Sequence, residues 1–385
     1  MKTLTTMNNT SRTMVWLASL VLVMGGTWAF ADPGPRMYSV TIQNLTDGQA
    51  FTPPLAITHS PMTQLFDVGL PASPEIQALA ENGNGAPLIE RLSGMPHVNI
   101  MEGMSGPLVP ASNPGGTHFT DATTLRIHGS EYANTLSLLA MLICTNDGFT
   151  GLNGVPLPHR GSKLFLTAGM DAGTEINTED YADLVPPCQG LFGVDSGISG
   201  TGASNPALAE AGLITHHAGI QGIKHLASEM HSWVNPVAKI TVTLTDPNAQ
   251  RFEADLSGAG EVPVVYSFAQ GRATLELHNH DRALHYKIDV SQISGITAAH
   301  IHAGLPHENG PAVALLAGPM PATGLVNGPL MQGVITEDDL RNGFEQDFSG
   351  LVAALRDGSL YINVHTEDSP SGEIRGQIGS IPIGQ

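Results

Sequence analysis

The sequence predicts an all-β fold: two β-sandwich domains in tandem, with a few short helices. Three observations indicate this class. Short apolar runs of Val, Ile and Leu recur between turns, Gly and Pro are abundant at 44 and 27 residues, and charged residues make up only 13% of the chain. This composition is typical of loop-rich β proteins rather than helical ones. The 385 residues are enough for two ordinary domains.

The first residues have the organisation of a secretory signal peptide. Lys2 and Arg12 flank the start of an apolar run over residues 14–23, and Ala-Phe-Ala at 29–31 provides a small-x-small cleavage site. We therefore predict a signal peptide over residues 1–31 and a secreted protein, either periplasmic or extracellular. A membrane anchor is disfavoured because a spanning helix needs roughly 20 apolar residues. We expect no transmembrane segment in the mature chain.

An excess of acidic residues limits the classes of partner. The chain has 35 Asp and Glu against 16 Lys and Arg, a formal net charge of −19. Nucleic-acid binding needs clustered Lys and Arg, so we expect no nucleic-acid partner. The balance suits a secreted protein in contact with cations. Its partner would be an extracellular or cell-surface protein or glycan.

The chain has two cysteines, Cys144 and Cys188. An even count in an exported protein predicts one disulfide, which would stabilise the fold by roughly 4 kcal/mol in the chain-entropy model. The alternative is a pair of buried thiols.

The first half, residues 37–245, alternates apolar runs with turns. The alternation in 37–43 suits a half-buried strand. The other predicted strands are the run that ends at Cys144 and residues 55–59, 124–127, 163–167 and 237–244. The predicted helices are residues 74–81 and 86–92. Residues 94–116 read as a long surface excursion, and 246–250 as a linker. We expect four histidines to be exposed, with a transition-metal site as the alternative: His216, His217, His225 and His231.

Three carboxylates follow two of these predicted strands. Asp147 comes after the run that ends at Cys144, and Asp171 and Glu175 follow the strand 163–167 on a Gly-containing turn. Crowded carboxylates repel one another, and a hard cation with oxygen ligands would remove that penalty. The three residues are a candidate calcium site. On spacing alone, ordinary turn and capping carboxylates are the favoured alternative.

Four segments of the first half carry motifs of a known family. They are the strand 37–43, Leu-Ala-Glu-Asn-Gly at 79–83, the stretch 141–149 and Asp-Ala-Gly-Thr-Glu at 171–175. On these motifs, residues 38–244 resemble a bacterial Spondin_N (F-spondin N-terminal) domain. The resemblance implies a C2-like sandwich that binds calcium at Asp147, Asp171 and Glu175. This chain departs from the family pattern in having Thr-Asn-Asp-Gly around Asp147 and Glu at position 175.

The second half, residues 251–380, also alternates strand-like runs and turns. Their regular spacing indicates a sandwich or barrel. The predicted strands are 251–256, 271–277, 283–290, 298–302, 313–316, 328–335, 360–365 and 373–378, and the predicted short helices are 337–344 and 351–357.

Three histidines of this half form a candidate transition-metal site. His300 and His302 project to one side of a strand because alternate residues share a face. If the strand with His365 lies next to it, three imidazoles converge. Such a set suits Cu(II) or Zn(II) better than calcium. The alternative is that the histidines satisfy hydrogen bonds in the sheet and its turns. A fourth ligand is expected from Glu367, Asp368, His307 or Glu308.

The second half also carries motifs of a known family, at residues 256–263, 299–304, 309–311, 361–366 and 372–377. Residues 252–379 resemble a CHRD (chordin) domain. The resemblance implies an extracellular all-β module associated with binding in larger secreted proteins, with no agreed activity. Glu261 and Arg375 are expected to pair as a structural salt bridge.

The first expectation for function is a secreted, non-enzymatic, calcium-binding adhesion or interaction protein. The alternative is a periplasmic or surface copper- or zinc-binding protein that uses His300, His302 and His365. A hydrolase ranks last because the sequence has no Gly-x-Ser-x-Gly elbow and no His-Glu-x-x-His motif.

Overall fold

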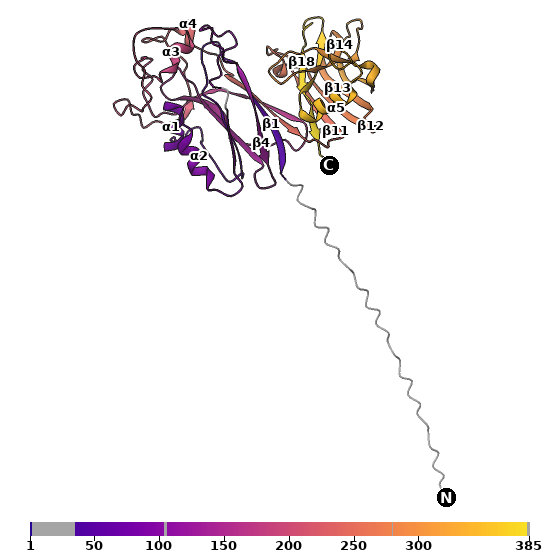
Figure 1. Cartoon of the computed structure of the whole chain (residues 1–385), viewed down its shortest axis with the longest axis horizontal. Helices are drawn as coiled ribbons and strands as arrows, with labels where there is room; N and C mark the ends of the chain where they lie inside the picture. Colours follow the sequence, from indigo (N-terminus) through magenta and orange to yellow (C-terminus); the bar gives the residue numbers. More distant parts are fainter. Residues whose placement is uncertain (2–34, 104–105, 279, 383–385) are drawn as a thin grey trace. The chain divides into compact units, whose positions relative to one another are not determined.

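The computed structural model describes residues 1, 35–103, 106–278 and 280–382 (Figure 1). These residues form several antiparallel sheets with few short helices, which confirms the predicted all-β class. Apart from Met1, the predicted signal peptide lies outside the described residues. None of the helices in the described ranges combines the length and apolar character needed to cross a bilayer.

The first half contains a four-stranded sheet in the order β4-β1-β10-β7. We expected β1 to be half-buried, but its residues from Ser39 onward are buried whichever face they occupy. Val40 and Ile42 pack into the core, while Thr41 on the other face bonds the hydroxyl of Thr124 at 2.8 Å. The strands are β1 (Arg36–Asn44), β4 (Ala122–Gly129), β7 (Ser162–Thr167) and β10 (Ala238–Thr245).

A six-stranded sheet in the order β3-β2-β5-β6-β8-β9 completes the first half. The prediction that 94–116 is only a surface excursion is wrong, because β3 lies within it and Leu108 is buried. The strands are β2 (Leu55–His59), β3 (Asn99–Glu102), β5 (Thr135–Met141), β6 (Gly148–Pro156), β8 (Gly169–Asp171) and β9 (Thr215–His216).

Two of the four helices in this half were predicted. Helix α1 (Pro74–Asn82) begins at Ser73, whose hydroxyl accepts from the backbone N–H of Ile76, and ends at Gly83 in the left-handed conformation. Helix α2 (Ala86–Ser93) follows it, and both pack their apolar faces against β2 and β5. The other two are short, α3 (Pro187–Leu191) and α4 (Ser228–His231).

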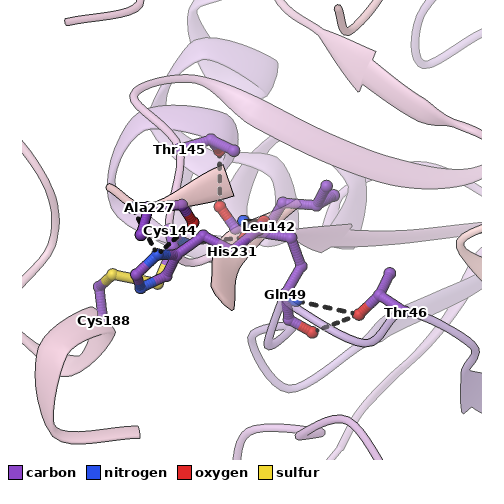
Figure 2. Close-up of a disulfide and its surroundings, with 8 residues drawn as sticks. All are labelled: Thr46, Gln49, Leu142, Cys144, Thr145, Cys188, Ala227 and His231. Atoms are coloured by element: carbon purple, nitrogen blue, oxygen red, sulfur yellow. Dashed lines mark hydrogen bonds between the residues drawn. A yellow bond between two sulfur atoms is a disulfide. The ribbon is translucent and has the colours of Figure 1, made fainter. Parts of the chain in front are cut away.

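The predicted disulfide joins Cys144 and Cys188, with a Cα–Cα distance of 5.1 Å (Figure 2). Gln49 stabilises its surroundings by accepting from the backbone N–H of Cys144 and donating to the carbonyl of His231. The prediction of four exposed histidines is wrong for His217 and His231, which are buried. Both lie against aromatic rings, which remove them from solvent. His216 and His225 are exposed.

The second half forms a single nine-stranded sheet that curls into a near-barrel. Its order is β15-β14-β17-β18-β11-β12-β13-β16, and β19 pairs with β11. The strands are β11 (Arg251–Ser257), β12 (Gln270–His278), β13 (Ala283–Ile293), β14 (Ile296–Ala303), β15 (Ala312–Ala317), β16 (Val326–Ile335), β17 (Leu360–Thr366), β18 (Ile374–Gln377) and β19 (Gly379–Ile381).

One of the two helices predicted in the second half is present. Helix α5 (Phe348–Asp357) buries Leu351 and Leu355 in the core of the near-barrel. The other, predicted over 337–344, is only a 3₁₀ turn at Glu337–Asp339. The chain leaves the helical conformation at Leu340, which is extended and forms a β-bridge with Ala314.

Candidate metal centre

The register between β14 and β17 brings the three predicted histidines together. His302 lies opposite Tyr361, His300 opposite Asn363, and Ala298 opposite His365. Positions 298, 300 and 302 share one face of β14, so their partners on β17 project to the same face. His365 is therefore diagonal to His300, within reach of its ring. The intervening residues Ile301, Ile362 and Val364 point into the hydrophobic core.

The three rings present free nitrogens to one another. One ring nitrogen from each histidine lies within 4.8 Å of the others. Nδ1 of His302 donates to the carbonyl of Gly310 at 2.9 Å, and Nδ1 of His365 donates to that of Pro370 at 3.0 Å. These bonds fix the tautomer and leave Nε2 of both rings as lone-pair donors. Three ring nitrogens are buried without a partner: Nδ1 of His300, Nε2 of His302 and Nε2 of His365.

The histidines are held in the neutral form that metals require. Burial, together with the neighbouring His365 and His302, lowers the pKa of His300 to about 4. Burial also lowers the pKa of His302 and of His365, although their backbone hydrogen bonds oppose the shift. At neutral pH all three imidazoles therefore have a lone pair available.

Tyr361 and Arg375 support this cluster, a role that the sequence did not predict for either residue. The ring of Tyr361 stacks on His302 at 5.0 Å between centroids, and the guanidinium of Arg375 lies 3.4 Å from the Tyr361 centroid. The Tyr361 hydroxyl accepts from the N–H of Gly310, the residue whose carbonyl orients His302. Tyr361 is directly opposite His302 in the strand pairing, so only the register between β14 and β17 could have revealed that the two rings stack.

Arg375 does not form the expected salt bridge with Glu261. Its guanidinium donates instead to the carbonyls of Leu305 and Glu308 and to the side-chain oxygen of Asn309. Arg375 therefore fastens the loop that ends at Gly310, and through that loop it positions His302.

The expected fourth ligands are not part of the cluster. Glu367 and Asp368 are exposed, and His307 faces Glu308 at 3.6 Å. In the described ranges, the group that could hold an ion here consists of His300, His302 and His365 alone.

The three carboxylates of the first half lie near the start of β6 and the end of β8, and most of their oxygens accept hydrogen bonds. Oδ2 of Asp147 accepts from the backbone N–H groups of Thr174 and Glu175 at 2.7 and 3.1 Å. Asp171 accepts from Gly173 and Asn177, and Glu175 from Asn205. The described part of the chain does not bring these three carboxylates within 4.8 Å of one another.

Asp147 nevertheless has one oxygen without a partner. The side chain is 0% exposed, and Oδ1 is buried and makes no hydrogen bond. Burial and, to a smaller extent, the negative charge of Asp171 together raise the pKa of this carboxyl to about 7. Two carboxylates destabilise one another here, which is the condition that a bound cation would relieve.

The fold and geometry of the second half define an all-β module with a histidine cluster on one face of its sheet. Residues 252–378 match the model of the CHRD domain, so this half is a CHRD domain, as its motifs indicated. No Spondin_N match is found for the first half. No curated protein matches the chain.

Proposed function

We propose that this chain is an extracytoplasmic binding protein, not an enzyme, whose CHRD domain binds copper or zinc through His300, His302 and His365. The observation that carries the proposal is the convergence of three buried, unpartnered ring nitrogens. Imidazole is a ligand that suits both metals.

Hydrogen bonding within the sheet does not account for the cluster. The carbonyls of Gly310 and Pro370 satisfy only one nitrogen of His302 and of His365. An unsatisfied buried polar atom costs about 1–3 kcal/mol, so three of them together would be a large penalty for an ordinary sheet. A metal ion that accepts all three lone pairs removes it.

Calorimetric titration with Cu²⁺ and Zn²⁺, followed by elemental analysis, tests this function. We expect about one ion per chain at the triad, and a His365→Ala variant that binds at least tenfold more weakly. The matched control replaces His278 and His285, an exposed pair with ring centroids 4.3 Å apart that belongs to none of the three-ligand groups in the described ranges. Unchanged binding after replacing all three triad histidines, in a variant that still folds, would refute the proposal.

The extracytoplasmic location is part of the proposal. The Cys144–Cys188 disulfide supports it, because such bonds persist in oxidising compartments. The charge pattern of residues 1–31 supports export. Mass spectrometry of the exported protein should find an N-terminus at Asp32. A cytosolic protein with an intact Met1 would contradict it.

Calcium binding by the first half is a second candidate function, favoured by the unpartnered Oδ1 of Asp147. In this proposal Asp147, Asp171 and Glu175 bind calcium, and the stabilised loops engage an extracellular or cell-surface protein or glycan. The Spondin_N-like motifs support the same reading.

Thermal unfolding with calcium or with chelator tests this second candidate. Calcium should raise the melting temperature of the native chain but not that of Asp147→Asn. The control is Asp195→Asn, since Asp195 is an exposed turn aspartate that accepts from Gly197. If the native chain melts identically with calcium and with chelator, the calcium site is wrong.

A further inference from the structure

The oxidation state of the bound metal follows from the surroundings of the histidine triad. The three unpartnered nitrogens are inaccessible to water although their residues are only half-buried. One ring nitrogen of each histidine lies within 4.8 Å of the other two. Within the residues that the structure describes, the group contributes three neutral donors and no carboxylate.

Coordination number separates the candidate ions. Zinc sites take four ligands, and Cu(II) prefers a tetragonal set, so both need an additional ligand at this triad. Cu(I) has a filled d shell and is saturated by a trigonal set of three nitrogens. The convergence of three buried nitrogens therefore matches Cu(I) without a further group.

Charge favours the same ion. No ligand compensates the metal charge, so the occupied site carries the whole charge of the ion in a partly desolvated environment. Arg375 lies behind Tyr361, which stacks on His302. Arg341 donates its backbone N–H to Val313 of β15, the strand that pairs with β14 and lies opposite His300. Two nearby positive charges penalise a divalent ion more than a monovalent one.

We propose that the triad of His300, His302 and His365 is a cuprous site, which binds Cu(I) in preference to Cu(II) and Zn(II). This inference rests on the proposed metal-binding function and adds the identity and charge of the ion.

Competition titrations on the full chain test it. Cu(I) is measured without oxygen against bathocuproine disulfonate, and Cu(II) and Zn(II) are measured against nitrilotriacetate. We expect Cu(I) to bind about a hundredfold more tightly than either divalent ion, given the additional charge that each of them brings next to two arginines. If Cu(II) or Zn(II) binds to the triad as tightly as Cu(I), this inference is wrong but the metal-binding function stands. If none of the three ions binds to the triad, both fail.

An arginine variant tests the electrostatic cause separately. Arg341→Glu should lower the ratio of Cu(I) to Cu(II) affinity by about tenfold, equivalent to a reduction potential lower by about 59 mV for this one-electron couple. Arg341 is exposed, and its backbone donates to the carbonyl of Val313 and accepts from the N–H of Phe344, so a change of its side chain should leave the fold intact. The matched control is Arg282→Glu, another exposed arginine of the same domain. If the ratio of Cu(I) to Cu(II) affinity changes equally in both variants, or changes in neither, Arg341 does not set the preference for Cu(I).

Discussion

Glu261 shows how a buried charge makes stability depend on pH. It is 4% exposed, and Oε1 has no hydrogen-bond partner. Its pKa is raised from 4.5 to about 7, because the effect of burial exceeds the opposing effect of the positive charges of Arg375 and Lys239. Between pH 4.5 and about 7, this side chain is protonated in the folded chain and ionised in the unfolded chain. The free energy of unfolding therefore falls as pH rises through this window.

Glu261→Gln should abolish this part of the pH dependence. We expect the variant to be more stable than the native chain above pH 7, by on the order of 1–3 kcal/mol, because the buried side chain no longer ionises. Denaturant unfolding at several pH values measures the difference. Glu276→Gln, at an exposed glutamate, is the control. Parallel pH profiles for the native chain and Glu261→Gln would contradict the assignment.

Gly310 is a residue on which the geometry of the histidine triad depends. A Cβ at this position would lie 1.5 Å from the carbonyl oxygen of Ala303, so the backbone would have to move. The Gly310 carbonyl orients His302, which makes that movement a change at the proposed metal site as well. Gly310→Ala should lower both the free energy of unfolding, by about 2–4 kcal/mol, and the affinity for copper.

Gly324→Ala is the matched control for this prediction. Gly324 has open space where a Cβ would be and no positive φ. Calorimetric titration with copper and denaturant unfolding should show little change in this variant. A Gly310→Ala protein that binds copper with native affinity would show that the Gly310 carbonyl does not position His302.

At the residue scale, the sequence reveals some members of the site better than others. His300 and His302 could be placed on one face because side chains alternate along a strand. His365 required the assumption that its strand is a neighbour, which the pairing of β14 with β17 confirms. Tyr361 and Arg375 carry no pattern of their own. Their role depends on which residues lie opposite them, and a register between distant strands cannot be read from local periodicity.

The Cys144–Cys188 bridge acts at the scale of whole elements. It connects the end of β5 to α3 and closes a loop with a sequence separation of 44 residues that includes β6, β7 and β8. A double Cys→Ser variant should lose roughly 2–4 kcal/mol of stability, because its unfolded chain is freer. Denaturant unfolding measures this loss.

Reduction of the native chain provides the control for the bridge. A phosphine reductant should lower the unfolding midpoint of the native chain to that of the double variant and leave the variant unchanged. If the reductant has no effect on a chain whose bridge is shown by peptide mapping to be open, the bridge does not stabilise these elements.

Elements whose own residues carry capping or periodicity signals were predicted well. Strands that form only because neighbouring strands pair with them were not. Helix α1 has a Ser cap, a Pro in its first turn and a Gly at its end, all visible in the sequence. Strand β6 was missed because its residues, Gly-Phe-Thr-Gly-Leu-Asn-Gly-Val-Pro, are mostly turn formers. It becomes a strand because β5 and β8 pair with it on either side, which buries Phe149 and Thr150. Tertiary pairing overrides local preference there.

For the whole molecule, the arrangement of the cores predicts that the two candidate sites act independently. The hydrophobic cluster around the histidine triad is drawn from residues 249–378, and the other clusters from residues 38–244, so they have no residue in common. The triad lies on β14 and β17 of the nine-stranded sheet. Asp171 ends β8 and Asp147 directly precedes β6, and both of these strands belong to the six-stranded sheet.

Independent sites should have additive effects. Asp147→Asn should leave the copper affinity of the triad within about twofold of native, and His365→Ala should leave the calcium-dependent rise in melting temperature intact. The free-energy changes of the double variant should equal the combined effects of the two single variants within about 0.5 kcal/mol, because the sites share no partner residues. A departure of more than about 1 kcal/mol in this double-mutant cycle would mean that one metal is sensed at the other site, and the chain would then be a coupled two-metal protein rather than two binding modules in series.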